Sequence, residues 1–223
     1  MLTRVDIANY RGFKSYRMEG LAQVNLIVGK NNSGKTALVE AIHFATTGGD
    51  PTILTETAIR RGEVIETEDS PRTLADVTHF FHGHQIGPGS VFSIAADNGY
   101  PQLFVRLVDM PQDPELFPTD GEGFDGRAVM GLQIEGGTGY GSRVSDIGLS
   151  ERGGLIFNRR ARFALGASSP QAPAPTTVFL PTESVSGAKM TQLWRNALLD
   201  ASNPQVVSAV QLVESEITEI LYV

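Results

Sequence analysis

Apolar positions near the start of the chain follow two different periods. Residues 2–8 alternate loosely between apolar and polar types and predict a strand, and residues 24–28 form a short apolar run typical of a buried strand. After residue 36 the apolar positions take a helical spacing, which the Gly-Gly-Asp-Pro run at 48–51 ends. The helically spaced residues are Ala37, Leu38, Ala41, Ile42 and Ala45. The pattern therefore predicts strand, aromatic turn, strand, loop and helix in this order.

Beyond residue 90 the pattern predicts an antiparallel β subdomain, residues 90–165. The Asp-Asn-Gly sequence at 97–99 separates two strand-like runs and favours a hairpin between them. The strands expected in this subdomain are 91–95, 103–108, 128–135 and 155–163. The elements expected outside it are helices at 52–61 and 74–81, an acidic exposed loop at 63–69, a strand at 177–180, and helices at 186–200 and 204–220.

Residues 29–36 read Gly-Lys-Asn-Asn-Ser-Gly-Lys-Thr, the complete phosphate-binding pattern GxxxxGK[ST]. Gly29 and Gly34 allow a tight curl in which backbone N–H groups point at phosphate oxygens. Lys35 is expected to reach the β- and γ-phosphates, and Thr36 to offer its hydroxyl to Mg²⁺. A strand before the loop and a helix after it are the context that the motif requires, because the positive helix end then faces the anion. An α/β fold of the P-loop NTPase class, with ATP and Mg²⁺ as cofactors, is therefore expected.

Composition narrows the class of protein further. The chain has 223 residues, of which 41% are hydrophobic and 19% charged, as in a folded globular protein. It has no cysteine, which excludes disulfides and thiolate metal sites and favours a reducing, cytoplasmic location. No apolar run is long enough to span a membrane, and the N-terminus does not read as a signal peptide. The net charge of −7 gives no global attraction to nucleic acid, although it leaves room for a local basic patch.

The acidic half of a hydrolytic site is not evident in the sequence. A P-loop ATPase needs an apolar strand that ends in an Mg²⁺-binding acid, with a carboxylate that orients water. The nearest match ends at Asp109, but Arg106 interrupts its apolar run and the Asn-Gly turn before it favours a hairpin strand. Glu183 follows the short strand at 177–180 and is expected to lie in a loop. The Leu-Ser-Glu-Arg-Gly-Gly run at 149–154 is similar to a signature that contacts the γ-phosphate, yet the residues after it predict a strand, not the required helix.

Three N-terminal motifs together carry a family resemblance. They are Ile-Ala-Asn-Tyr-Arg-Gly-Phe-Lys-Ser at 7–15, the run from residue 24 through the P-loop to 42, and Ala-Ile-Arg-Arg-Gly at 58–62. This region resembles the ABC-type ATPase heads of the RecF/SMC group, and most of all the overcoming-lysogenisation-defect (OLD) family. The resemblance is strong over residues 2–62 and loose over 63–223.

The resemblance implies a two-lobed ATPase head of which this chain is the first lobe. The lobe would be a single unit over 1–223 with three parts: a P-loop unit (1–62), the β subdomain (90–165), and a strand and C-terminal helices (177–223). The second lobe, with the signature and catalytic acids, is missing. In the family, ATP is hydrolysed between two heads. The implied partners are therefore a second copy or a second lobe, with nucleic acid or a nuclease, and a membrane is not implied.

The same resemblance assigns the nucleotide site residue by residue. It places Asn31, Asn32, Ser33 and Gly34 in the backbone cradle with Gly29, and Lys35 and Thr36 at phosphate and Mg²⁺. It also places Arg11 near the nucleotide, with a solvated turn arginine as the alternative.

Three further groups of residues have ordinary structural readings. His79, His82 and His84 are close in sequence, but no carboxylate is spaced to complete a metal site with them. The arginines at 159, 160 and 162 are expected on a solvated strand face. Trp194 is expected to anchor a helix in the core.

Three hypotheses about function follow. The first is the MgATP-binding lobe of an ABC/OLD-like ATPase that serves DNA repair or anti-phage defence. The second is a nucleotide sensor that binds ATP without hydrolysing it. The third is an ABC transporter ATPase, which the long β insertion and the spacing from Tyr10 to Gly29 fit poorly. The physiological target, the oligomeric state and the catalytic residues stay open at this point.

Overall fold

The computed structural model describes most of the first two thirds of the chain and short pieces of the rest. The described residues are 1–67, 70–100, 102–109, 130–138, 141–150, 153–156, 177–181, 187, 190–191, 193–195, 203–212 and 214–217. The chain divides into two compact units, Met1–Thr177 and Val178–Val223, and each is described by itself.

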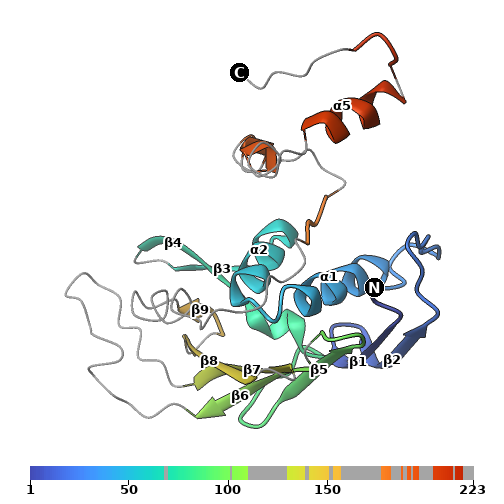
Figure 1. Cartoon of the computed structure of the whole chain (residues 1–223). Helices are drawn as coiled ribbons and strands as arrows, with labels where there is room; N and C mark the ends of the chain where they lie inside the picture. Colours follow the sequence, from blue (N-terminus) through green and yellow to red (C-terminus); the bar gives the residue numbers. More distant parts are fainter. Residues whose placement is uncertain are drawn as a thin grey trace. The chain divides into compact units, whose positions relative to one another are not determined.

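The first unit contains a seven-stranded sheet in the order β2-β1-β5-β6-β7-β8-β9, in which every neighbouring pair is antiparallel (Figure 1). Its strands are β1 Arg4–Tyr10, β2 Phe13–Glu19, β5 Val91–Ala96, β6 Gln102–Asp109, β7 Met130–Thr138, β8 Gly141–Leu149 and β9 Leu155–Ile156. A separate antiparallel pair consists of β3 Val64–Thr67 and β4 Ser70–Ala75. The fold is thus mixed α/β, and β1 and β2 belong to the same sheet as the predicted β subdomain.

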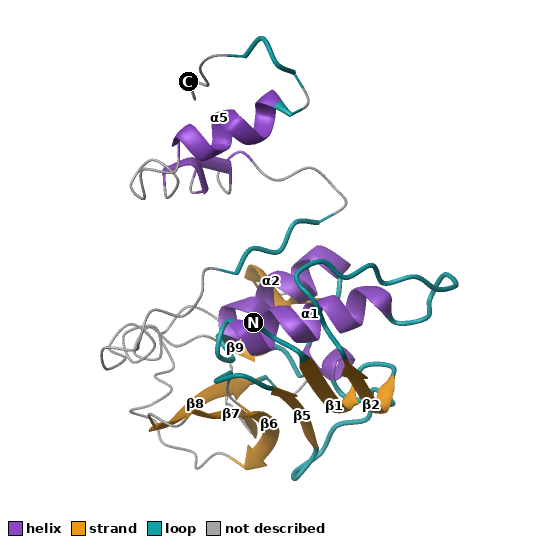
Figure 2. Ribbon diagram, turned by 45° about the vertical axis from the view of Figure 1, so that its right-hand side comes forward, coloured by secondary structure: helices purple, strands orange, loops and turns teal. Residues whose placement is uncertain are grey.

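Helices α1 (Lys35–Thr46) and α2 (Pro51–Arg61) lie on one side of this sheet, with a short 3₁₀ helix at Val77–Phe80 (Figure 2). The start of α2 is capped, because the Asp50 side chain accepts the N–H of Thr52 and Pro51 occupies the first turn. Its end is marked by Gly62 in the left-handed conformation. The helix predicted at 52–61 is therefore confirmed.

The core lies between the sheet and the helices and is built from alternate strand residues. Ile7 pairs with Ile94, which pairs with Leu103, so these side chains share the buried face. Each of the three is no more than 2% exposed. From above the sheet, Leu38 and Phe44 of α1 complete the same cluster. The hydrophobic alternation that predicted these strands is thus the burial pattern of one sheet face.

The clearest correction concerns residues 24–28, predicted as a buried strand. They are irregular, and Val24, Leu26 and Val28 are 88%, 87% and 77% exposed. Ile27 packs against the core. No described strand pairs with this segment, and an apolar run without a neighbour to share backbone hydrogen bonds cannot become a buried strand.

Other predicted elements differ in type or length. The aromatic turn at 9–16 is shorter than expected, because β2 begins at Phe13, and the loop expected at 63–69 contains β3. The helix expected at 74–81 is the end of β4 followed by the 3₁₀ helix. β8, which was not predicted, lies between β7 and β9 in the sheet. β9 ends at Ile156, and the rest of the strand expected at 155–163 lies outside the described residues, as do the arginines at 159, 160 and 162.

The second unit is described only in part. Residues 178–181 are irregular, so the strand predicted at 177–180 is not found. Helix α5 spans Asn203–Gln211, which is shorter than the predicted 204–220. Within 186–200 the described residues are helical, and Trp194 among them is partly buried. Among the described residues, no helix is both long and apolar enough to cross a lipid bilayer.

Tyr10 provides a pH-dependent test of the core. Its side chain is 1% exposed and its ring lies 5.2 Å from that of Phe92. Burial raises the pKa of Tyr10 from 10.0 to about 12. As pH rises through this window the unfolded chain loses the phenol proton before the folded chain does, so stability falls. The loss attributable to Tyr10 should reach about 2–3 kcal/mol at the upper end.

Urea unfolding of the wild-type chain and of Tyr10→Phe across this alkaline range measures the effect. The difference in unfolding free energy between the two proteins should shrink or reverse as pH rises, because only the wild type carries the phenol. A constant difference across the range would show that Tyr10 is not the group responsible.

Candidate functional site

The P-loop curls between the exposed segment 24–28 and helix α1. Asn32 and Gly34 both have left-handed backbones, with φ of 61° and 88°. The loop closes on itself through a hydrogen bond from the Ser33 N–H to the Lys30 carbonyl, 3.3 Å long. Gly34 is the N-cap of α1 and makes no side-chain cap, and the first helical turn carries no acidic residue. The positive end of the α1 dipole is therefore not neutralised by the chain itself, which suits an anion.

Lys35 lies over this loop. Its Nζ donates to the Gly29 carbonyl at 2.8 Å and to the Lys30 carbonyl at 2.7 Å. The ammonium is thus held at the concave side of the curl, beside the N-terminus of α1. A helix end, a lysine and a run of backbone N–H groups in one place are the elements of a phosphate site.

Seven of the eight residues assigned to nucleotide from the sequence lie together in this loop and the start of α1. They are Gly29, Asn31, Asn32, Ser33, Gly34, Lys35 and Thr36, and all are at least partly exposed. The Thr36 hydroxyl stays the predicted Mg²⁺ ligand. The residues fit a bound triphosphate in type, order and accessibility.

Arg11, the eighth residue, has a different environment. Its side chain is 8% exposed, and its two terminal nitrogens bind the two carboxylate oxygens of Glu63 at 2.7 and 2.9 Å. Its guanidinium also lies over the Phe80 ring, 4.6 Å from the centroid. Burial opposes the charge, yet the Glu63 hydrogen bond and the carboxylate of Glu40 raise the pKa of Arg11 overall. Arg11 is therefore a buried, permanently charged residue and not a solvated turn arginine.

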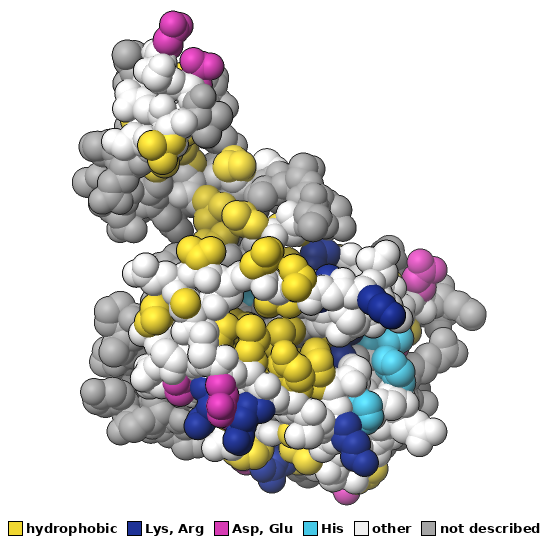
Figure 3. Space-filling model, turned by 90° about the vertical axis from the view of Figure 1, so that its right-hand side faces the viewer, with side chains coloured by type: hydrophobic (Ala, Val, Ile, Leu, Met, Phe, Trp, Pro, Cys, Tyr) yellow, Lys and Arg dark blue, Asp and Glu magenta, His cyan; other side chains and the backbone are white. Residues whose placement is uncertain are grey.

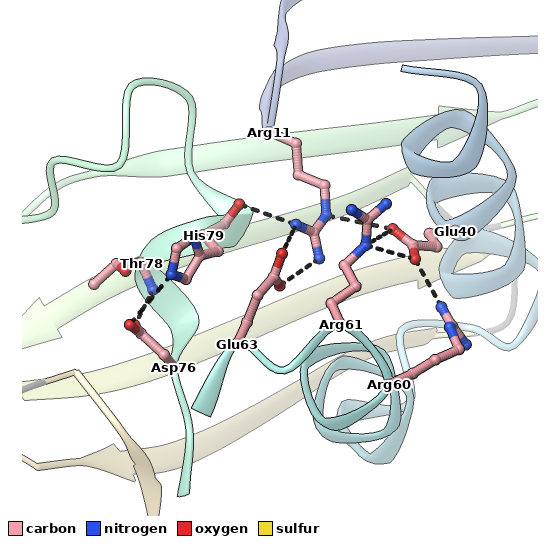
Figure 4. Close-up of polar contacts among 8 residues, drawn as sticks. All are labelled: Arg11, Glu40, Arg60, Arg61, Glu63, Asp76, Thr78 and His79. Carbon is pink, nitrogen blue, oxygen red and sulfur yellow. Dashed lines mark hydrogen bonds and ion pairs between the residues drawn. The ribbon is translucent and has the colours of Figure 1, made fainter. Parts of the chain in front are cut away.

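Glu40 on α1 is the centre of an arginine–glutamate cluster, which consists of Arg11, Glu40, Arg60, Arg61 and Glu63 (Figure 4). The Glu40 side chain is 1% exposed. It accepts from Arg60 at 2.7 Å and from the Nε of Arg61 at 2.9 Å, and the Nε of Arg11 lies 3.4 Å away. The cluster joins the P-loop helix to the end of α2 and to the β1–β2 turn.

The role of Glu40 was not predicted from the sequence, and the prediction for Glu63 was wrong. Glu63 was expected in an exposed acidic loop, but its side chain is 14% exposed and pairs with Arg11. One signal was available: Arg60 and Arg61 place two cations side by side at a helix end, and partly buried charges favour a carboxylate partner. The spacing of Glu40 on the apolar face of α1 could have supplied it.

The three histidines lie near the cluster. The His79 and His84 rings are 5.1 Å apart, and His79 pairs with Asp76 at 3.6 Å. The His82 Nδ1 lies 2.8 Å from the Arg11 carbonyl. Figure 3 shows histidine side chains beside basic ones on one face. In the described part of the chain, no group of three or more histidine, aspartate or glutamate side chains could hold a metal ion.

Of the two acidic residues considered for hydrolysis, the structure describes Asp109 alone. Asp109 ends β6, which pairs antiparallel with β5 and β7, so the hairpin interpretation of this strand is confirmed. Leu155 and Ile156, after the Gly-Gly pair of this run, form strand β9, which pairs antiparallel with β8, as the sequence predicted. Glu183 lies outside the described residues.

Comparison with known proteins agrees with the loop geometry. Residues 1–78 match the family model described as an AAA ATPase domain. The N-terminal part of this chain is thus similar to an AAA ATPase domain. The match includes β1, β2, the P-loop, α1 and α2, and every member of the arginine–glutamate cluster.

Curated relatives match this chain over short stretches. The DNA replication and repair protein RecF of Marinomonas sp. is 53% identical over 47 residues, which is 21% of this chain and 13% of the relative. RecF of Acinetobacter baumannii is 45% identical over 47 residues, 21% of this chain and 13% of that protein. An ATP/GTP phosphatase of Helicobacter pylori is 39% identical over 44 residues, 20% of this chain and 12% of the relative. The chain therefore covers about an eighth of the length of these relatives.

Proposed function

We propose that this chain binds MgATP through residues 29–36 and is the nucleotide-binding lobe of an ABC-type ATPase of the RecF/SMC/OLD group. The observation that carries the proposal is the geometry at the start of α1, where an uncapped helix end, the left-handed Gly34 and the Lys35 ammonium meet. In this proposal the backbone N–H groups of the loop and Lys35 hold the phosphates, and Thr36 holds the metal. Mg²⁺, when bound, would neutralise phosphate charge and orient the terminal phosphate.

The wider role is a DNA-related process such as repair or anti-phage defence, in the cytoplasm. It is supported by the RecF relatives, whose own name describes DNA replication and repair. The proposed partners are a second copy or a second ATPase lobe, together with nucleic acid or a nuclease. In this proposal the partner supplies the acids for ATP hydrolysis, and the position of Asp109 on an antiparallel hairpin strand supports that arrangement.

Lys35→Ala is the direct test of nucleotide binding. The variant should bind ATP at least about tenfold more weakly, since it loses a charge-assisted contact to phosphate worth about 1.5–3 kcal/mol. Isothermal titration with ATP and Mg²⁺ measures the affinity. Lys30→Ala is a matched control, because Lys30 is an exposed lysine of the same loop whose side chain the motif does not use. Undiminished ATP affinity in Lys35→Ala would overturn the proposal.

A nucleotide sensor without turnover is the second candidate. The position of Asp109 on a hairpin strand favours it over hydrolysis by this chain alone. Phosphate release at several protein concentrations separates the two: Lys35-dependent turnover that rises with the square of concentration indicates an ATPase that works as a dimer. ATP binding without turnover at any concentration favours the sensor or the need for a second lobe.

A further inference from the structure

Phe13, the first residue of β2, contacts the P-loop. A Cβ built on Gly34 would lie 2.8 Å from the Cζ of Phe13 and 3.4 and 3.5 Å from its two Cε atoms. The tip of the ring therefore rests against the Cα of Gly34, where there is room for a hydrogen only. The contact joins residues that are 21 positions apart in the printed sequence and both lie within the AAA ATPase match.

Gly34 is the residue through which the loop enters the helix. Its φ of 88° turns the chain into α1, and its carbonyl accepts the first helical bond, from the Leu38 N–H at 2.9 Å. The N–H groups of residues 34–36 are the ones that a helix N-terminus presents to an anion. A contact that fixes the position of Gly34 therefore also fixes the direction of these N–H donors.

The residues that precede Phe13 are themselves fixed in place by burial and hydrogen bonds. Tyr10 is buried, and the Arg11 N–H donates to the Phe80 carbonyl at 2.9 Å. The Arg11 guanidinium reaches Glu40, one and a half helical turns beyond Lys35 on the same helix. Two contacts therefore join this segment to α1. The Phe13 ring contacts the N-cap Gly34, and the Arg11 guanidinium pairs with Glu40.

We infer that Phe13 is a positioning residue of the phosphate site. It acts through Gly34 and does not touch the nucleotide. The ring blocks one side of the loop, so the loop keeps its curl before a triphosphate arrives and binding spends less free energy on ordering it. This inference rests on the proposed nucleotide binding and names the residue that preorganises the site.

The test compares three variants of the full chain. Phe13→Ala removes the contact of the ring tip with Gly34, and Phe13→Met keeps an apolar side chain of nearly the same length. Tyr16→Ala is the matched control, because its ring packs on Phe13 with centroids 4.9 Å apart but is not among the atoms nearest Gly34. For each variant, titration calorimetry measures binding of ATP and of inorganic tripolyphosphate with Mg²⁺, and circular dichroism measures the folded fraction at the same temperature.

Phe13→Ala should weaken both ligands by the same factor, about tenfold, because the lost preorganisation concerns the phosphates alone. Phe13→Met should recover most of the affinity, and Tyr16→Ala should bind like the wild type. Unchanged affinity in a folded Phe13→Ala would overturn the inference, and so would a loss confined to ATP, which would mean that the ring contacts the base. If Lys35→Ala abolishes binding while Phe13→Ala does not weaken it, the proposed function stands and only this inference fails.

Discussion

Replacing Glu40 by alanine destabilises the first unit by about 3–5 kcal/mol, the cost of removing one partner from a buried ion pair. The Glu40 carboxylate is 1% exposed and faces three guanidinium groups, those of Arg11, Arg60 and Arg61. Without it, Arg60 and Arg61 lose this carboxylate, and Arg11 stays buried with Glu63 as its remaining ion-pair partner. Urea unfolding followed by circular dichroism measures the loss.

Asp6→Ala is the matched control for this prediction. Asp6 also pairs with two arginines, Arg4 and Arg17, but their side chains are 51% and 64% exposed. Exposed pairs contribute about 0–1 kcal/mol, so this variant should unfold close to the wild type. If Glu40→Ala lost no more stability than Asp6→Ala, the arginine–glutamate cluster would not stabilise the packing of α1 on its neighbours. The Phe13 contact with Gly34 would then be the remaining contact of this segment that could fix the helix.

The parts of the fold that the sequence predicted well are those set by local chemistry. Helix α2 has its Asp50 cap, its proline and its glycine stop within the segment itself. The hairpin between β5 and β6 has the Asn-Gly pair at its turn, with Asn98 and Gly99 both at positive φ. The P-loop was readable because its chemistry needs fixed residue types at fixed spacing.

The parts that failed depend on partners distant in sequence. Residues 24–28 have the apolar composition of a buried strand, but strand formation needs a neighbour for the backbone, which composition does not reveal. Glu40 and Glu63 are 23 positions apart in the sequence, and both pair with Arg11, which is distant from each of them in sequence. Phe13 on Gly34 is likewise a tertiary contact. The site's charge and loop could be predicted, whereas the residues that hold the loop in place could not.

Substitution of Gly49 by alanine should destabilise the fold by about 2–5 kcal/mol, from two sources. Its φ of 77° is left-handed, which costs a residue with a Cβ about 1–2 kcal/mol. The added Cβ would also lie 2.9 Å from Leu103 Cδ2 and 3.2 Å from Ile134 Cγ2, both core side chains, and overpacking there costs about 1–3 kcal/mol. The Gly49 N–H closes the end of α1 on the Phe44 carbonyl at 3.0 Å, so the chain cannot move away without loosening that helix.

Gly62→Ala separates these two sources. Gly62 ends α2 with a φ of 70°, yet a Cβ there would meet nothing within 4 Å. It therefore carries the backbone cost alone, and the difference in unfolding free energy between the two variants measures how tightly α1 is seated on Leu103 and Ile134. Equal losses in unfolding free energy would mean that Leu103 and Ile134 shift to make room for the added Cβ. A larger loss at Gly49 would mean that the C-terminal end of the P-loop helix is fixed by packing on the sheet, in the same way that Phe13 is proposed to fix its beginning.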